Sequence, residues 1–311
     1  MKKKTIGFLL FLVCLFSLTG CTSYVKDKNK KIVKNEVTGQ NLTKNILCKP
    51  TDKEILKLYN DNKVKIEKLP ECDEMGIASK NYDVLWLTIF VQPHAWLIIQ
   101  IGKLVKNYGL AIILATLLIR LAVYPFTKKS ALQSENMKKA KQKLDKLEEK
   151  YKGKNDQESM MQKSQEMMVI YKEYGINPLS GCIFSLIQIP LFFAFLEALN
   201  RLPAIFEEKF IGFELGTSPM TALKSGHWYY LIFVVLVVVT TFFSFKLNQT
   251  ASMSQEQEKQ MKMMMNMSIV FIGIASISMS TGIELYWIVN SGFTIIQNLL
   301  VKRSKKNANI I

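Results

Sequence analysis

Histidine and cysteine are scarce in this sequence of 311 residues, which contains two histidines and five cysteines. Neither His94 and His227 nor the cysteines follow a metal-site spacing, so no metal site is predicted. A GxxxxGK(S/T) phosphate-binding loop is missing, and with it the nucleotide site that this motif would indicate. The long apolar segments hold no pair of aspartates and no serine–histidine pair, which disfavours an intramembrane protease. We therefore expect no catalytic residues, no cofactor and no enzymatic activity.

Acidic residues are outnumbered, with 25 Asp and Glu against 41 Lys and Arg, which gives a formal net charge of +16. Hydrophobic residues make up 49% of the chain and come in long blocks, which is typical of a polytopic membrane protein. The lysines and arginines lie mostly between and after these blocks. This distribution favours contact with acidic lipid, RNA or a ribosome surface, rather than sequence-specific binding to DNA.

The first residues combine three lysines, a short apolar run and small residues at its exit. This is the pattern of a secretory signal, and the run is too short for a comfortable spanning helix. Residues 18–21 read Leu-Thr-Gly-Cys, which resembles the lipobox of bacterial lipoproteins. The resemblance implies cleavage before Cys21 and lipidation of its thiol. An uncleaved anchor with a chance cysteine is the alternative that stays open.

The segment from Thr22 to Asp83 is expected on the outer side of the membrane. Its first part, YVKDKNKKIVKNE, is rich in lysine and lacks apolar periodicity, so we expect a tether. A later stretch, DKEILKLYNDN, predicts some helix. Cys48 and Cys72 would lie in an oxidising compartment, where they could pair. The sequence leaves that pairing open, because it does not show whether their Cα atoms come within about 7 Å.

The remaining blocks predict an all-α polytopic membrane protein with five transmembrane helices, a cytoplasmic helical hairpin and an outer interfacial amphipathic helix. Lysine-rich loops orient it in a bacterial cell membrane, with a lipid-anchored N-terminus outside and the C-terminus in the cytoplasm. The expected parts are a signal peptide at 1–20, an extracytoplasmic segment at 21–83, an amphipathic helix at 84–106, spans at 107–128, 177–200, 227–247, 266–283 and 284–303, the hairpin at 129–176, an outer loop at 201–226, a cytoplasmic loop at 248–265 and a basic tail at 304–311.

The hairpin segment is charged, rich in helix formers and interrupted at residues 153–156. Apolar residues at helical spacing predict the faces on which its two arms pack together. These residues are Met137, Leu144, Leu147 and Tyr151 on the first arm and Met160, Met161, Met167 and Tyr171 on the second.

One arginine, Arg120, lies inside the apolar run from Tyr108 to Lys129. At about 1.5 Å per residue it is roughly 12 Å from the end of the run, too deep for an ordinary terminal anchor. A guanidinium at that depth costs free energy unless it faces water or polar partners. Thr116, Tyr124 and Thr127 share its helical face, so we expect a polar stripe that lines a wet cavity. An arginine that snorkels, or that pairs with a structural acid, is the open alternative.

A second polar stripe occurs in the last apolar block, where Trp287, Asn290, Ser291, Thr294 and Gln297 recur at helical spacing. Another polar side chain, Gln188, lies in the middle of the block at 177–200, close to Pro190. The polar residues that stand out within the apolar blocks are therefore Arg120, Thr116, Gln188, Trp287 and Asn290.

Three blocks, in order around a charged hairpin, resemble those of the YidC/Oxa/Alb family of membrane protein insertases, specifically its five-span lipoprotein type. They read NYGLAIILATLLIRLAVYPFTKKS, NPLSGCIFSLIQIPLFFAFLEAL and GIELYWIVNSGFTIIQNLL. The likeness extends from about Trp86 to Arg303, and the segment from Thr22 to Asp83 is not covered by it.

The resemblance implies five helices around a hydrophilic groove that opens to the cytoplasm and the lipid. Arg120, Gln188 and Trp287 match groove positions of the family, and Pro125, Pro178 and Pro190 match its structural prolines. Together with Thr116 and Asn290 of the polar stripes, the three groove residues are expected to line the groove and contact its substrate. A client's hydrophilic, often acidic end would enter the groove while its apolar segment moves into lipid between the second and fourth spans. The implied partners are nascent membrane proteins, including lipoproteins, the Sec translocon, the ribosome and membrane lipids.

Two other classes of membrane protein compete with this interpretation. A small-molecule transporter or channel would also use an intramembrane arginine, but it predicts an inverted repeat and an acidic residue at mid-depth. The sequence shows neither, because Glu197 and Glu284 lie near the outer ends of their blocks. A lipoprotein receptor with passive helices would not need polar stripes.

Lipidation of Cys21 predicts a mature chain that begins at this residue and carries acyl chains. Intact-mass analysis of the purified protein should show the loss of residues 1–20 together with the added mass of the lipid. A Cys21→Ser variant should keep its signal residues, and a wild-type mass that still includes them would contradict the expectation.

Overall fold

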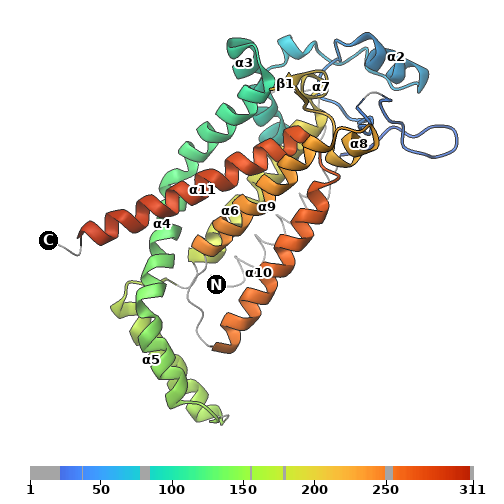
Figure 1. Ribbon diagram of the computed structural model, residues 1–311. Coiled ribbons are helices and arrows are strands. Elements are labelled where there is room, and N and C mark those ends of the chain that lie inside the picture. The colour runs from blue at the N-terminus through green and yellow to red at the C-terminus, as the bar shows by residue number, and fades with distance from the viewer. Residues whose placement is uncertain are drawn as a thin grey trace. The chain divides into compact units, whose positions relative to one another are not determined.

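The computed structural model describes residues 22–36, 38–77, 85–154, 156–177, 180–248 and 255–308. The expected signal peptide, Cys21 and Pro178 lie outside these residues. Most of the described chain is helical, as the all-α prediction expects (Figure 1). The chain divides into two compact units. Unit 1 comprises residues 1–119, 186–237 and 274–289, and unit 2 comprises 120–185, 238–273 and 290–311.

Helices dominate both units, and the few strands are short. The α-helices are α2 (Lys53–Asp61), α3 (Gln92–Val105), α4 (Tyr108–Lys150), α5 (Gln157–Glu173), α6 (Ser180–Arg201), α7 (Pro203–Phe206), α8 (Pro219–Lys224), α9 (Leu231–Asn248), α10 (Gln255–Ser276) and α11 (Thr281–Ala308). Shorter elements are η1 (Cys72–Glu74), η2 (Leu87–Val91) and η3 (Trp228–Tyr230), and the antiparallel pair β1 (Lys209–Phe210) and β2 (Phe213–Glu214).

Among the described residues, two helices are long and apolar enough to cross a membrane, namely Tyr108–Lys150 and Trp228–Leu247. The other three predicted spans correspond to α6, α10 and α11. The structure is therefore that of a helical membrane protein, and the crossing by all five helices belongs to the proposal below.

The lysine-rich stretch at 24–36 is folded, so the expectation of a tether was wrong. Its backbone pairs with the chain that follows, through hydrogen bonds from Val25 N to Leu42 O at 2.8 Å and from Val33 N to Val25 O at 2.9 Å. Val25 and Leu42 are buried in a small core with Tyr59. Val33 packs against the same core, while the lysines of the stretch are exposed. So few core residues give no apolar periodicity in a segment this rich in lysine.

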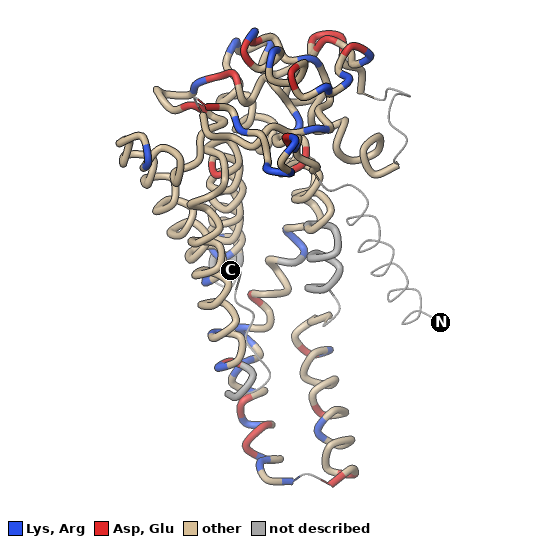
Figure 2. Tube along the Cα trace, turned by 90° about the vertical axis from the view of Figure 1, so that its right-hand side faces the viewer, with Lys and Arg blue, Asp and Glu red and all other residues tan. Residues whose placement is uncertain are grey.

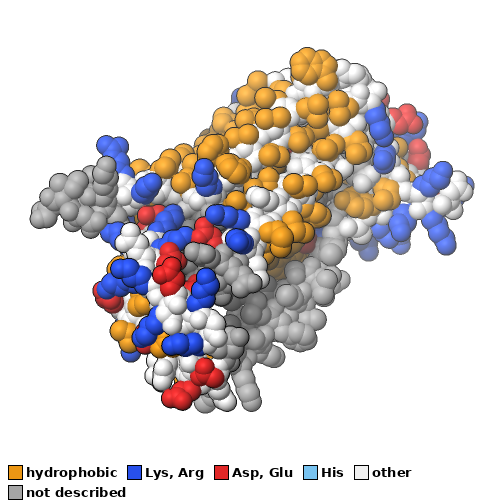
Figure 3. All heavy atoms as spheres, turned by 60° about the horizontal axis from the view of Figure 1, so that its bottom comes forward, with side chains coloured by type: hydrophobic (Ala, Val, Ile, Leu, Met, Phe, Trp, Pro, Cys, Tyr) orange, Lys and Arg blue, Asp and Glu red, His pale blue; other side chains and the backbone are white. Residues whose placement is uncertain are grey.

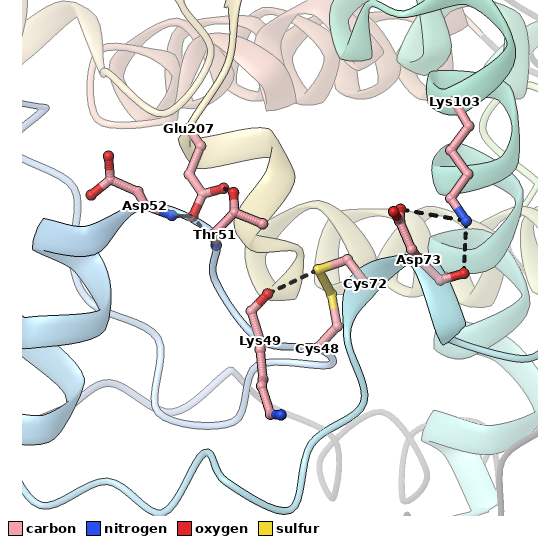
Figure 4. Close-up of a disulfide and its surroundings, with 8 residues drawn as sticks. All are labelled: Cys48, Lys49, Thr51, Asp52, Cys72, Asp73, Lys103 and Glu207. Carbon is pink, nitrogen blue, oxygen red and sulfur yellow. Dashed lines mark hydrogen bonds and ion pairs between the residues drawn. A yellow bond between two sulfur atoms is a disulfide. The ribbon is translucent and has the colours of Figure 1, made fainter.

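A disulfide joins Cys48 and Cys72, with an S–S distance of 2.03 Å and Cα atoms 4.8 Å apart (Figure 4). Polar contacts fasten the chain on both sides of it. Glu207, at the end of α7, accepts hydrogen bonds from the backbone N–H groups of Thr51 at 2.9 Å and Asp52 at 3.0 Å. Lys103 of α3 donates to the carbonyl of Asp73 at 2.6 Å. The disulfide therefore lies within a segment that is docked on α3 and α7.

The main core of unit 1 lies among α3, the first turns of α4, α6, α7 and the start of α11. Phe195 of α6 stacks on Tyr286 of α11 with ring centroids 4.2 Å apart, and His94 of α3 meets Phe195 edge to face. Between α3 and α4 the chain turns at Lys106, whose φ is 52°. Asn107 then caps α4 by accepting a hydrogen bond from Leu110 N at 2.8 Å.

In unit 2, α4 continues without a break past the expected end of the first span at residue 128, through Pro125, to Lys150. The span and the first arm of the hairpin are therefore one helix, because strong helix formers follow directly on the apolar run. The hairpin carries charges of both signs (Figure 2) and is joined by ion pairs from Lys143 to Glu173 and from Lys150 to Glu166.

The arms of the hairpin pack around Leu144 and Tyr171, with Met137 and Met167 beside them. These residues were expected on the inner faces, as were Leu147 and Tyr151, which are also buried. Met160 and Met161 were also expected there, but their exposed fractions are 58% and 59%. The prediction was wrong for this pair because the packed core of the hairpin lies toward the other end of α5.

The last two helices meet at residues 277–280, where the chain turns. Residues 281–283, expected at the end of the fourth span, belong instead to α11. The loop before α8 explains the position of the turn. Thr217 O accepts a hydrogen bond from Thr281 N at 2.9 Å, and Leu215 O accepts one from Gly282 N at 2.9 Å. These carbonyls satisfy the first N–H groups of α11, which no preceding helical turn provides for.

Removal of the disulfide should loosen the docked segment without unfolding the helices. We expect Cys48→Ser/Cys72→Ser to destabilise the segment at 48–72 by about 3 kcal/mol, since the cross-link limits the entropy of its opened state. Hydrogen exchange of α2 and the flanking residues should accelerate in the variant. Reductant should do the same to the wild type and leave the variant unchanged. Equal exchange in all four samples would contradict the prediction.

Candidate functional site

Arg120 lies on α4 with an exposed fraction of 6%. Its Nε donates a hydrogen bond of 2.6 Å to Oδ1 of Asn290 on α11. An amide oxygen orients a guanidinium without neutralising its charge. The two residues come from the two polar stripes that the sequence shows, and the structure brings them together.

The same two helices are joined again further along α4. Thr127 Oγ1 donates to Oε1 of Gln297 at 3.0 Å, and both side chains are buried. Between the two hydrogen bonds, the rings of Tyr124 and Phe293 meet edge to face with centroids 6.4 Å apart. Positions three and four residues apart share one face of a helix, so these contacts form a continuous seam with a polar contact at each end.

The polar character of unit 2 extends beyond this seam. The other buried polar side chains described there are hydroxyl and amide groups from three helices. They are Ser134 on α4, Thr241 and Ser244 on α9, and Ser291 and Asn298 on α11. Uncharged polar groups at this density supply partners for a charge or for water, and they do not compete with a bound ligand as a carboxylate would.

Three residues predicted for the groove lie outside this seam. Thr116 has an exposed fraction of 1%, and its hydroxyl donates to Ile112 O at 2.6 Å within its own helix. Trp287 is half-buried and its ring meets Phe192 edge to face at 5.1 Å. Gln188 belongs to α6, and its side chain lies outside the described part of the structure. A groove role for these three remains a prediction.

Sequence reasoning missed a second buried arginine. Arg201, counted as a charge of the outer loop, has an exposed fraction of 1% and forms an ion pair of 2.8 Å with Glu197. The indole of Trp86 donates to Glu197 at 3.1 Å. The spacing of four residues on one helix was the available signal. This pair lies in unit 1, where it is a packed structural element.

A charged contact links the hairpin to α10 within unit 2. Glu258 lies 2.5 Å from Lys141 Nζ on α4 and 2.8 Å from Lys262 on its own helix. The hydrogen bonds from Lys141 and Lys262 lower the pKa of Glu258 to about 2. One turn before Lys141, Lys138 donates to Leu247 O at the end of α9 at 3.1 Å. The first arm of the hairpin is thus held to the end of α9 and to the start of α10.

Comparison with known proteins identifies the family to which these features belong. A family model described as "60Kd inner membrane protein" matches residues 100–308. The membrane protein insertase YidC of Oceanobacillus iheyensis is 32% identical over 241 residues, which cover 76% of this chain and 91% of the relative. The insertase MisCA of Bacillus subtilis is 35% identical over 70% of this chain and 79% of its own length. YidC 2 of Bacillus anthracis is 35% identical over 70% of this chain and 81% of its own length.

The contact between Lys141 and Glu258 should depend on pH. The pKa of Glu258 is lowered in the folded protein, so the stability that its ionised carboxylate contributes is fully present above the ordinary pKa near 4.5. It should be lost as the pH falls from about 4.5 towards about 2, and amount to at most about 1 kcal/mol for a partly exposed pair. Glu258→Gln should accelerate hydrogen exchange at the start of α10 at pH 7.

The matched control is Glu166→Gln, which removes a carboxylate paired with Lys150 inside the hairpin. It should leave exchange at the start of α10 unchanged. If both substitutions change hydrogen exchange at the start of α10 equally, the Lys141–Glu258 contact does not hold α10.

Proposed function

The chain belongs to the 60Kd inner membrane protein family, which includes the YidC membrane protein insertases, and we propose that it inserts nascent membrane proteins through the polar face around Arg120. One observation carries this proposal. Arg120 lies on α4, a helix that is apolar enough to cross a membrane, and its buried guanidinium donates a hydrogen bond to Asn290 of α11. A cation at that depth costs free energy, and a polar or acidic client segment offsets the cost when it arrives.

We propose that α4, α6, α9, α10 and α11 all cross the bacterial membrane. The N-terminal segment, anchored through Cys21, would lie outside, and the hairpin and C-terminus in the cytoplasm. The lysine-rich hairpin and the basic residues at the end of α11 support this orientation, because short cytoplasmic loops carry an excess of Lys and Arg.

In this mechanism, the hydrophilic end of a client enters the groove beside Arg120 from the cytoplasm. Its path through hydrocarbon becomes shorter, and the positive potential favours acidic residues. Gln188, Trp287 and Thr116 would line the rest of the path. Entry of the client's apolar segment into lipid then drives insertion, since each buried methylene contributes about 0.8 kcal/mol. The mechanism needs no cofactor.

The client's apolar segment would leave beside α6 and α10. Exposed apolar side chains gather on helix surfaces in Figure 3. On α10 the most exposed are Phe271 at 72%, Met267 at 66% and Ile274 at 65%. Such a surface suits acyl chains and passing apolar helices alike, and methionine adapts to varied shapes.

Clients and the other partners would meet the protein on its cytoplasmic side. The hairpin exposes charges of both signs and the methionines Met160 and Met161, which suits a surface that receives clients (Figure 2). The basic residues Lys302 and Arg303 at the end of α11 would contact ribosomal RNA through phosphate groups. Action beside the Sec translocon is part of the same proposal.

The charge of Arg120 is tested by two substitutions and two clients. In proteoliposomes, Arg120→Ala should reduce insertion of a client with an acidic end by about tenfold, which corresponds to the loss of one charge-assisted contact. Arg120→Lys should retain much of the activity. Protease protection of the translocated end measures insertion.

A client with its acidic residues replaced by asparagine or glutamine is the control, because its insertion should respond little to Arg120→Ala. Thermal melting of each variant checks its folding. Equal loss with Arg120→Lys and Arg120→Ala, in folded protein, would show that the guanidinium has a fixed structural role and would sink the proposed mechanism.

A further inference from the structure

A cavity of about 430 Å³ lies within unit 1. The folded segment at 24–43 forms one wall. The opposite wall comes from the loop at 216–218, from α8, and from the turn at 278–280 that precedes α11, and Asn200 closes it at the end of α6. Four parts of the chain that are distant in sequence thus meet around one space.

Glycine allows the walls to approach so closely. Gly39 has φ of +67°, and a Cβ at this position would lie 2.2 Å from Cγ2 of Thr221 on α8. A Cβ at Gly216 would lie 2.5 Å from Oε1 of Gln40 and 3.2 Å from the backbone of Phe206. A side chain at Gly39 would press against Thr221 of α8, and one at Gly216 would press against Gln40 of the folded segment. The two glycines therefore allow the close approach of the walls around the cavity.

The lining has the chemistry of an anion site. It includes Lys34 and Lys224, and no Asp or Glu occurs among the lining residues that the structure describes. Neither lysine forms an ion pair with a described residue. Neutral hydrogen-bonding groups complete the walls, among them the side chains of Tyr24, Asn41 and Ser280. Two ammonium groups with neutral donors suit the several oxygens of a phosphate group.

An apolar surface adjoins the wall of the cavity that carries Lys224. On α8, Met220 and Leu223 are 44% and 41% exposed, and they precede Lys224 on the same helix. The chain then passes through η3, where Trp228 is 72% exposed, and enters α9, one of the two helices apolar enough to cross a membrane. Exposed tryptophan at the start of such a helix marks the level of lipid headgroups. The cavity wall thus borders the surface where phospholipids lie.

We propose that this cavity binds the phosphate of an anionic phospholipid, with Lys34 and Lys224 on the phosphate and the acyl chains along α8 and the first turns of α9. The proposal depends on α9 crossing the membrane and not on the insertase function. Its consequence is that the folded segment at 24–43 is held on the membrane surface by lipid as well as by protein contacts.

Native mass spectrometry of the full-length protein in mild detergent tests the site, with phosphatidylglycerol, phosphatidylcholine and the deacylated headgroup glycerophosphoglycerol as probes. Phosphatidylglycerol should bind most tightly. Lys34→Gln and Lys224→Gln should each weaken its binding about tenfold, and the double variant about 100-fold, as expected for two charge-assisted contacts to one group. Lys34→Arg and Lys224→Arg should stay close to the wild type.

The matched control is Lys53→Gln/Lys57→Gln on α2, which removes the same charge from exposed lysines that do not line the cavity. Its binding should equal that of the wild type. Equal weakening by control and cavity variants would overturn the site, and so would equal binding of phosphatidylcholine. Glycerophosphoglycerol that binds as tightly as the lipid would overturn the assignment of a lipid. Client insertion, measured separately, should be unchanged in all these variants.

Discussion

A permanently charged side chain persists inside a membrane-spanning helix only where polar partners surround it. In this protein the partner seen for Arg120 is the amide of Asn290, and the face that joins α4 to α11 continues to Thr127 and Gln297. This seam fixes which sides of two helices are polar. The proposed insertion mechanism depends on this seam, since a cation that is oriented by an amide can attract an incoming acidic segment.

The two buried arginines of the chain illustrate two uses of the same group. Arg201 lies against Glu197 on its own helix, in a core that also contains Trp86. A carboxylate at 2.8 Å offsets the cost of burial and makes the pair a structural element. Arg120 instead contacts an amide on another helix. The contacts described for the two arginines thus differ in the chemistry of the partner, a carboxylate for Arg201 and an amide for Arg120.

Helix type and the polar stripes were predictable, because long apolar blocks and three-to-four spacing are local signals. The contact between Arg120 and Asn290 was not, since 170 residues separate them and only the fold pairs the two stripes. The turn at 277–280 depended on carbonyls from Leu215 and Thr217, which no local pattern reveals. The folded segment at 24–36 was missed because its core residues, Val25 and Val33, are few and lie among exposed lysines. The link between Cys48 and Cys72 requires a Cα separation that only the fold gives.

The central claim is that the surroundings of Arg120 are wet. Tyr124, one turn along the same face, can be replaced by p-cyanophenylalanine in protein reconstituted into lipid, and the infrared nitrile stretch reports local hydration. The same probe at Phe195, in the core of unit 1 with an exposed fraction of 1%, supplies the dry reference. We predict a stretch at position 124 that matches the probe in water. A stretch that matches position 195 would contradict the proposed role of Arg120.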